Sequence, residues 1–378
     1  MKLKVSLVLI VLAILSLSLQ MLPSCYSDNI SYSYQLLNKP DGSTPYRLNV
    51  VIPQSLLEYY VGNSHALYSD SDFAEFVTPN ALRPIAEVMQ QIYQSEEDFA
   101  NGVLMIVHQI NYEPTVPSKY PVETMAVNSG DCDLFSYIAA SIVAAAGMNA
   151  VLFYYESEAH MNLGVSLAQP PEEARGQPYC MTYNGVEYYV AECTGGNWQT
   201  GWRVGECPPD LKFADARIIT LENMEQVSVG QVSASLNNLS PSTISLSLST
   251  TIVTGGSPVT LSGELSPLRA EEAVSIYMKV NSEPWRLIGT TLTDTNGRYM
   301  LTWTADSDGI CYFRGSWSGS TEYAAADSPV QSVTVISTFF IILLVVTAVL
   351  VSAGVIVLVM SRQTHQPGLE LLPPEIPT

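Results

Sequence analysis

Apolar residues recur every three or four positions in two stretches, 79–93 and 96–108, and this spacing predicts two amphipathic helices. A third helix is predicted over 133–146, where small apolar residues run up to Gly147, a residue suited to end a helix. Beyond it, alternating apolar and polar residues predict three strands, at 150–155, 160–167 and 186–193. Helices followed by antiparallel strands are typical of an α+β domain.

The pattern changes in the second half of the chain. Residues 227–243 are rich in Ser, Asn and Gln, and we expect them to be a linker. From 244 to 335 the chain alternates in short segments separated by turn signals such as Asp294-Thr295-Asn296-Gly297. About seven short strands in about 90 residues are typical of an immunoglobulin-like sandwich, which is the fold we expect for residues 244–335.

Both ends of the chain carry long apolar segments. Residues 1–25 begin with two lysines and continue as an apolar run, which predicts a signal peptide or an N-terminal anchor, with lipid attachment at Cys25 as an alternative. Residues 336–360 form an apolar run without a charge, long enough for a transmembrane helix. Residues 361–378 would then be a short cytoplasmic tail, and the domains would lie outside the cell at the membrane.

Length and charge narrow the functional classes. The chain has 378 residues, enough for two domains between the terminal segments, and we place the first at 26–226 with its core at about 79–209. Asp and Glu number 36 against 16 Lys and Arg, a formal net charge of −20. Because phosphates repel such a chain, we expect no nucleic-acid partner.

The candidate chemistry begins with Cys132, which lies where the third predicted helix starts. Unpaired backbone N–H groups and the helix dipole favour a thiolate at this position. A cysteine nucleophile needs a base, and the chain has four histidines. His365 follows the predicted span, His108 falls in an apolar helix and His65 in an irregular polar stretch. His160, at the mouth of a predicted strand, is therefore the expected base.

A carboxylate that holds the second imidazole nitrogen would complete the site. Glu192 is a charged residue in the otherwise apolar strand 186–193, although a strand-end residue exposed to water would show the same pattern. Alone, each of Cys132, His160 and Glu192 has an ordinary structural explanation. Their order and contexts together favour catalysis.

The motifs around these residues resemble the transglutaminase-like superfamily, and in particular its prokaryotic membrane-anchored members. The likeness covers about residues 79–209, and its cysteine and histidine blocks are the specific parts. It comprises Tyr120-Pro121-Val122-Glu123, Gly130-Asp131-Cys132-Asp133, the alanine-rich helix, the His160 strand, the strand from Tyr188 to Thr194, and Gly205-Glu206-Cys207-Pro208.

The resemblance implies an α+β papain-like domain, here followed by the immunoglobulin-like sandwich and a single transmembrane helix. It also implies a Cys-His-Asp triad at Cys132, His160 and Glu192, with Glu in place of Asp. Gln109 would be an oxyanion donor, beside the backbone N–H of Cys132. The expected activity is acyl transfer through a Cys132 thioester, by hydrolysis or transamidation of peptide or protein amides at the cell surface, without a cofactor.

Two alternatives stay open at this point. In the first, the protein is a catalytically silent surface protein that uses both domains as a binding or adhesion scaffold. The second concerns Cys180, Cys193 and Cys207, which lie close together in the sequence and allow one disulfide in three pairings. A metal site at these cysteines is not expected, because they lack a C-x-x-C pair and a fourth ligand.

Overall fold

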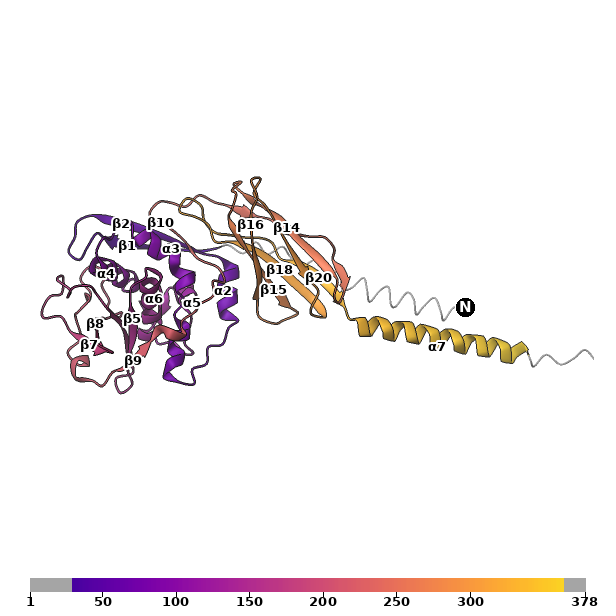
Figure 1. The fold of residues 1–378 in the computed structure, drawn as a ribbon, viewed down its shortest axis with the longest axis horizontal. Helices are drawn as coiled ribbons and strands as arrows, with labels where there is room; N and C mark the ends of the chain where they lie inside the picture. Colours follow the sequence, from indigo (N-terminus) through magenta and orange to yellow (C-terminus); the bar gives the residue numbers. More distant parts are fainter. Residues whose placement is uncertain (1–28, 364–378) are drawn as a thin grey trace, which may run out of the picture.

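The computed structural model describes residues 29–363. The predicted signal segment with Cys25, and residues 364–378 of the predicted tail, lie outside this range. A larger body of helices and strands comes first, a body of strands alone packs beside it, and a last helix extends away from the second body (Figure 1).

The helices of the first body follow the apolar spacing of the sequence. Three of them, α3, α4 and α6, confirm the helices predicted over 79–93, 96–108 and 133–146. Ser95 caps α4 by accepting a hydrogen bond from the N–H of Asp98, and α3 begins with Pro79, as helix starts allow. The helices are α2 (Gln54–Val61), α3 (Pro79–Met89), α4 (Glu96–Val107), α5 (Pro121–Val127) and α6 (Cys132–Ala145), with 3₁₀ turns η1 (Asp70–Phe76), η2 (Leu211–Phe213) and η3 (Leu221–Asn223).

An antiparallel five-stranded sheet lies against α6, in the order β7-β8-β6-β5-β9. Leu152, Leu163 and Ala191 belong to the main core of the domain, whereas Val151 and Val190 belong to a second cluster on the opposite face. Both faces are thus apolar, and the strands predicted at 150–155, 160–167 and 186–193 are confirmed. The strands are β5 (Ala150–Tyr155), β6 (His160–Val165), β7 (Cys180–Tyr183), β8 (Val186–Ala191) and β9 (Arg217–Thr220).

A second, three-stranded sheet has the order β1-β2-β10. Its bounds are β1 (Ile30–Leu37), β2 (Pro45–Ile52) and β10 (Ser233–Ser235). β10 lies within the segment expected to be a linker, yet it pairs with β2, and its Ala234 and the preceding Val232 are buried. Residues 227–243 therefore contribute a strand to the first body instead of forming a free connection. The sequence did not reveal this strand, because it is only three residues long and lies in a stretch of mostly polar residues.

The second body consists of two sheets around one core. One sheet contains β11, β12, β14 and β17, the other β13, β15, β16, β18, β19 and β20. Val259, Ile276, Phe313 and Trp317 fill the space between them. The strands are β11 (Thr243–Ile244), β12 (Ser247–Leu248), β13 (Ile252–Thr254), β14 (Pro258–Ser266), β15 (Ala273–Val280), β16 (Arg286–Leu292), β17 (Arg298–Thr304), β18 (Gly309–Trp317), β19 (Ala326–Asp327) and β20 (Gln331–Ile336).

The expected fold class was wrong in its last element, the single transmembrane helix at 336–360. That segment forms α7 (Thr338–Gln363). Among residues 29–363, no helix is both long enough and apolar enough to cross a membrane. The prediction rested on the length of the apolar run and on its lack of charge, and it gave no weight to hydroxyl residues inside the run, where Thr347 and Ser352 donate to backbone carbonyls of α7.

The two bodies are joined by a buried polar interface. Arg314 of β18 is 7% exposed, and its Nη1 lies 2.7 Å from Oε2 of Glu58 on α2. The Arg314 guanidinium also lies over the Trp285 ring, 5.0 Å from its centroid. One turn earlier on α2, the N–H of Ser55 donates to Oδ2 of Asp327 at 2.7 Å. Burial raises the pKa of Asp327, in part against its hydrogen bonds. The second body is thus docked on α2.

We predict that Arg314→Ala loosens this docking. It leaves Glu58 without its buried partner and removes the stacking on Trp285, so we expect a loss of about 2 kcal/mol in the free energy of unfolding. Calorimetry should then resolve two unfolding transitions. The matched control is Arg286→Ala, which removes an exposed ion pair with Asp306 and should cost at most about 0.5 kcal/mol. Equal effects of the two substitutions would contradict the prediction.

Candidate functional site

Cys132 is the first residue of α6 and is held by a short strand pair. β3 (Asn111–Tyr112) runs parallel to β4 (Ser129–Gly130), with Tyr112 beside Gly130. Asp131 is extended and leads directly into the helix. Cys132 is 9% exposed, and its Sγ lies 3.9 Å from the carbonyl oxygen of Ala159. Cys132, the expected nucleophile, therefore lies at a helix N-terminus, next to the residue that precedes His160.

His160 opens β6 and faces both other members of the expected triad. Its Nε2 lies 2.9 Å from Oε2 of Glu192. A hydrogen bond to Cys132 also acts on the ring, and Nδ1 is the nitrogen that remains for it. The side chain keeps 20% of its surface exposed. The structure thus brings Cys132, His160 and Glu192 together in that order.

Glu192 follows the last residue of β8 and is fully buried. Its Oε2 accepts hydrogen bonds from His160 and, at 3.3 Å, from Nδ2 of Asn162. Its Oε1 accepts from the N–H of Thr194 at 2.8 Å and from the Thr194 hydroxyl at 2.5 Å. Four donors therefore surround the carboxylate. The strand-end explanation, a side chain exposed to water, does not hold.

The opposite charges of His160 and Glu192 stabilise each other. Burial by itself lowers the pKa of His160, but the hydrogen bonds to Cys132 and Glu192 outweigh it and raise that pKa to about 10. Burial by itself raises the pKa of Glu192, but His160 and Thr194 hold it below its ordinary value. Imidazolium and carboxylate are therefore the favoured forms at neutral pH.

An acidic pair, Asp131 and Asp133, flanks Cys132. Asp131 accepts a hydrogen bond from the N–H of Thr115 at 2.7 Å, and Asp133 accepts from the Ser118 hydroxyl at 2.9 Å. Burial and the neighbouring Asp133 raise the pKa of Asp131 to about 7. The loop that contains Thr115 and Ser118 thus closes one side of the site.

His108, which the sequence placed in an apolar helix, supports the site without being part of the triad. It is buried, and its Nε2 lies 2.9 Å from the carbonyl oxygen of Glu192. Burial lowers the pKa of His108. A side chain at Gly201 would meet the His108 ring at 2.6 Å, so the chain that follows Glu192 packs directly on this histidine. Only the fold could show this contact, because the partners are far apart in sequence.

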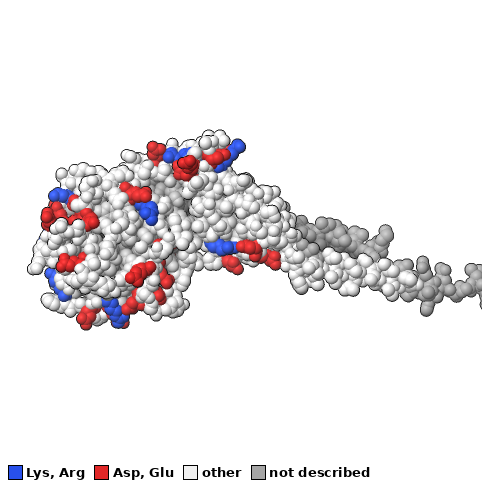
Figure 2. Space-filling view, viewed as in Figure 1, with Lys and Arg blue, Asp and Glu red and all other residues white. Residues whose placement is uncertain are grey.

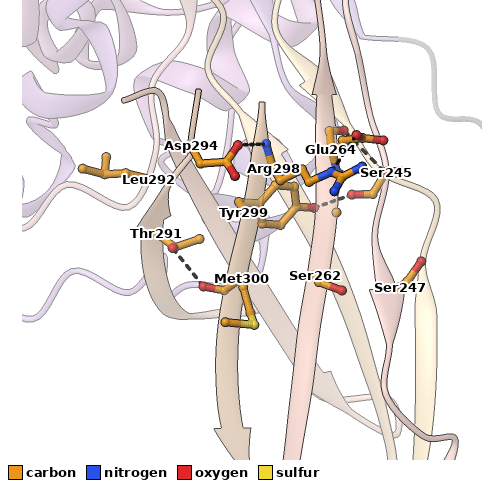
Figure 3. Close-up of a pocket in the computed structure, with 11 residues that line it drawn as sticks. Ser245, Ser247, Ser262, Glu264, Thr291, Leu292, Asp294, Arg298, Tyr299 and Met300 are labelled. Atoms are coloured by element: carbon orange, nitrogen blue, oxygen red, sulfur yellow. Dashed lines mark hydrogen bonds and ion pairs between the residues drawn. The ribbon is translucent and has the colours of Figure 1, made fainter. Parts of the chain in front are cut away.

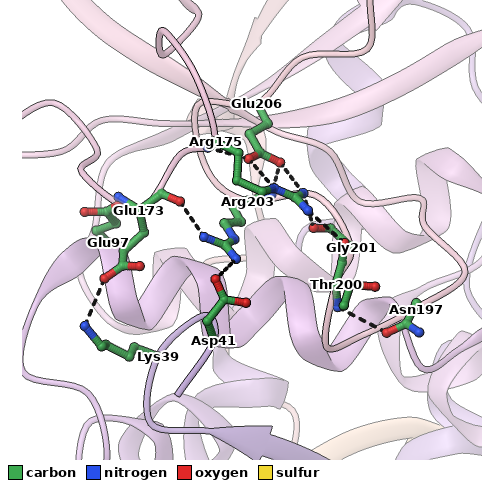
Figure 4. A network of polar contacts seen from close by, with 10 residues as sticks. All are labelled: Lys39, Asp41, Glu97, Glu173, Arg175, Asn197, Thr200, Gly201, Arg203 and Glu206. Atoms are coloured by element: carbon green, nitrogen blue, oxygen red, sulfur yellow. Dashed lines mark hydrogen bonds and ion pairs between the residues drawn. The ribbon is translucent and has the colours of Figure 1, made fainter. Parts of the chain in front are cut away.

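The loop after Glu192 is also fastened from the outside by a polar network (Figure 4). Arg175 binds both carboxylate oxygens of Glu206, at 2.8 and 2.6 Å, and donates to the carbonyl oxygen of Gly201 at 2.7 Å. Arg203 pairs with Asp41 of the β1–β2 turn. These contacts fix residues 194–207 relative to the segment of Arg175 and to the β1–β2 turn.

The structure does not bring Gln109 to the site. Its Nε2 donates to the carbonyl oxygens of Gln35 and Met105, at 2.8 and 2.7 Å, and its Oε1 accepts from the N–H of Gln35. Both amide hydrogens are therefore engaged, one with β1 and the other with the end of α4. The expectation of an oxyanion donor at Gln109 finds no support in this arrangement.

Cys180, Cys193 and Cys207 are all free thiols, so the expected disulfide among them is absent from the described chain. Cys193 belongs to the main core and Cys207 to the cluster on the other face, so the sheet separates them. Cys180 pairs with Tyr189, four residues before Cys193, which is about 13 Å along a strand. Proximity in sequence could not reveal these opposite faces.

A hollow of about 620 Å³ lies on the second body, lined by residues such as Ser262, Glu264 and Met300 (Figure 3), and it is remote from Cys132. Residues 29–363 contain no group of three or more His, Cys, Asp or Glu that could hold a metal ion. In Figure 2, charged side chains are scattered over the first body and also lie on the second, whereas none is seen on the part of the last helix that is drawn in white.

Comparisons with known proteins add little to this geometry. No protein-family model matches the chain, and no curated protein matches it. Among solved structures, the sulfur carrier protein SoxY from Chlorobium limicola f thiosulfatophilum is similar at 16% identity, over 26% of this chain and 86% of that one. The TM-score of 0.19 is too low for this likeness to carry an argument.

We predict that Glu192→Gln lowers the pKa of His160 from about 10 towards its ordinary value of 6.5. The substitution keeps the shape and removes the negative charge that stabilises the imidazolium. NMR titration of the ring protons of His160 measures the change, and Glu158→Gln on the exposed preceding turn is the control. A raised pKa adds stability that is complete below pH 6.5 and is lost as pH rises towards 10. The variant should lose most of this pH dependence, and an unchanged His160 titration would refute the assignment.

Proposed function

We propose that this protein is a cysteine acyl-transfer enzyme that acts on peptide or protein amides through a Cys132 thioester. One observation carries the proposal, the continuous hydrogen-bonded order of Cys132, His160 and a fully buried Glu192. A buried carboxylate is costly unless it is paired, and here its charge is directed at an imidazole that reaches a thiol. The resemblance of the cysteine and histidine motifs to the transglutaminase-like superfamily supports the same reaction class.

Each residue has a defined step in the proposed reaction. The Cys132 thiolate attacks the amide carbon, and the backbone N–H at the start of α6 stabilises the oxyanion. His160 transfers its proton to the leaving amine, and the C–N bond breaks as the thioester remains. Glu192 orients the ring and stabilises its charged form. Water or a second amine then attacks the thioester, with His160 accepting the proton of the incoming group.

The chemistry at Cys132 can be tested first without a natural substrate. We predict that iodoacetamide already alkylates Cys132 rapidly at neutral pH and alkylates it more slowly in His160→Ala, because the imidazolium stabilises the thiolate. Mass spectrometry of tryptic peptides reads the label at Cys132 and, as an internal control, at the half-buried Cys180. Equal and slow labelling of Cys132 in both proteins would eliminate the ion pair.

The reaction itself is tested with cell-surface extract, incubated with and without an added primary amine. We predict acyl-transfer products with the wild-type protein, and a loss of at least about 1,000-fold in Cys132→Ala, since the thioester cannot form. Mass spectrometry separates cleaved peptides, deamidated glutamines and amine adducts, and so separates hydrolysis from transamidation. Identical product sets from both proteins would favour a catalytically silent binding protein.

A further inference from the structure

The oxyanion that the proposed reaction forms needs donors, and the expected side-chain donor is occupied elsewhere. Gln109 donates both of its amide hydrogens to backbone carbonyl oxygens. The N–H of Cys132 is one donor, since the first N–H groups of a helix have no partner within it. Oxyanion holes commonly use two donors, so a second hydrogen-bond donor is expected beside Cys132.

Tyr112 lies three residues after Gln109 and is brought to Cys132 by the β3–β4 pair. Its Cα faces that of Gly130 across the ladder, one strand spacing of about 4.8 Å away. The N–H of Glu113 donates to the carbonyl oxygen of Gly130 and holds this register. Because Gly130 stands two residues before Cys132, the backbone of Tyr112 is fixed at the edge of the site.

The ring of Tyr112 is placed on the side of α6 that carries the nucleophile. It meets Phe135 edge-on, with centroids 6.2 Å apart. Phe135 follows Cys132 by three residues, and residues at this spacing share a helix face. The side chain of Tyr112 is 61% exposed, so a substrate has access to it.

The hydroxyl of Tyr112 is free to donate a hydrogen bond, and the charged groups around Cys132 act on it. No hydrogen-bond partner of this hydroxyl is found among residues 29–363. Partial burial and the charges of Cys132, Asp131 and Asp133 raise the pKa of the phenol. The phenol therefore stays protonated at neutral pH and has a hydrogen to donate. The two amide hydrogens of Gln109, by contrast, are already donated to backbone carbonyl oxygens.

We propose that Tyr112 is a catalytic residue whose hydroxyl donates a hydrogen bond to the oxyanion of the tetrahedral intermediate, beside the N–H of Cys132. This role rests on the proposed acyl transfer. The phenol keeps its proton throughout, and the hydrogen bond strengthens as the carbonyl oxygen gains charge. Attack on the thioester passes through a second oxyanion in the same position, so Tyr112 acts in both halves of the reaction.

The test compares two reactions of the same thiol in the full chain. Acylation of Cys132 by a p-nitrophenyl ester passes through an oxyanion, whereas alkylation by iodoacetamide does not. We predict that Tyr112→Phe, which keeps the ring on Phe135, lowers the acylation rate about 100-fold and leaves alkylation within about twofold. Tyr183→Phe, at another partly exposed tyrosine, is the matched control and should change neither rate.

The possible outcomes distinguish a failure of the role of Tyr112 from a failure of the proposed acyl-transfer function. Acylation of Tyr112→Phe at the wild-type rate would overturn the role of Tyr112 and leave the acyl-transfer proposal standing. An equal loss in acylation and alkylation would also overturn it, since a general disturbance of Cys132 explains that result. A wild-type protein that is alkylated but never acylated would overturn the proposed function, and the role of Tyr112 with it.

Discussion

The buried carboxylate of Glu192 is the constraint on which the rest of the first body depends. A charged group without exposure is tolerated only when its lone pairs are filled, and four hydrogen bonds from His160, Asn162 and Thr194 fill them. These donors come from β6 and from the chain after β8, so the carboxylate fixes the two segments against each other. The position and charge of His160 follow from this, and the order of Cys132, His160 and Glu192 is therefore a consequence of satisfying one charge.

Keeping Thr194 in place requires that the following loop does not move. His108 holds the carbonyl of Glu192 from inside, while Arg175 and Glu206 close the loop from the outer side. The long donor Gln109 is committed to β1 next to this helix end, which leaves the side of Cys132 to a residue from β3. Support of the carboxylate and the proposed oxyanion donors thus lie at two different edges of the site.

The sequence predicted well what depends on neighbouring residues. The spacing of Leu82 and Ile85 predicted α3, the position of Cys132 predicted the start of α6, and the residue types around His160 selected it from four histidines. Contacts between distant segments could not be predicted in this way. The pairing of β10 with β2, the capture of Gln109 by β1 and the separation of Cys193 from Cys207 by a sheet all depend on the tertiary fold.

The docking of the second body argues against a role as a mere spacer. A spacer needs no buried contact with the domain it carries, yet Arg314 loses most of its hydration to reach Glu58, and the partly buried Asp327 accepts the N–H of Ser55. Such desolvation is costly and persists only where the geometry is kept. Both partners lie on α2, which packs against α5 through Tyr60 and the adjoining Tyr120. Since α5 leads into the segment that carries Cys132, the second body supports, through α2, the helix that precedes Cys132.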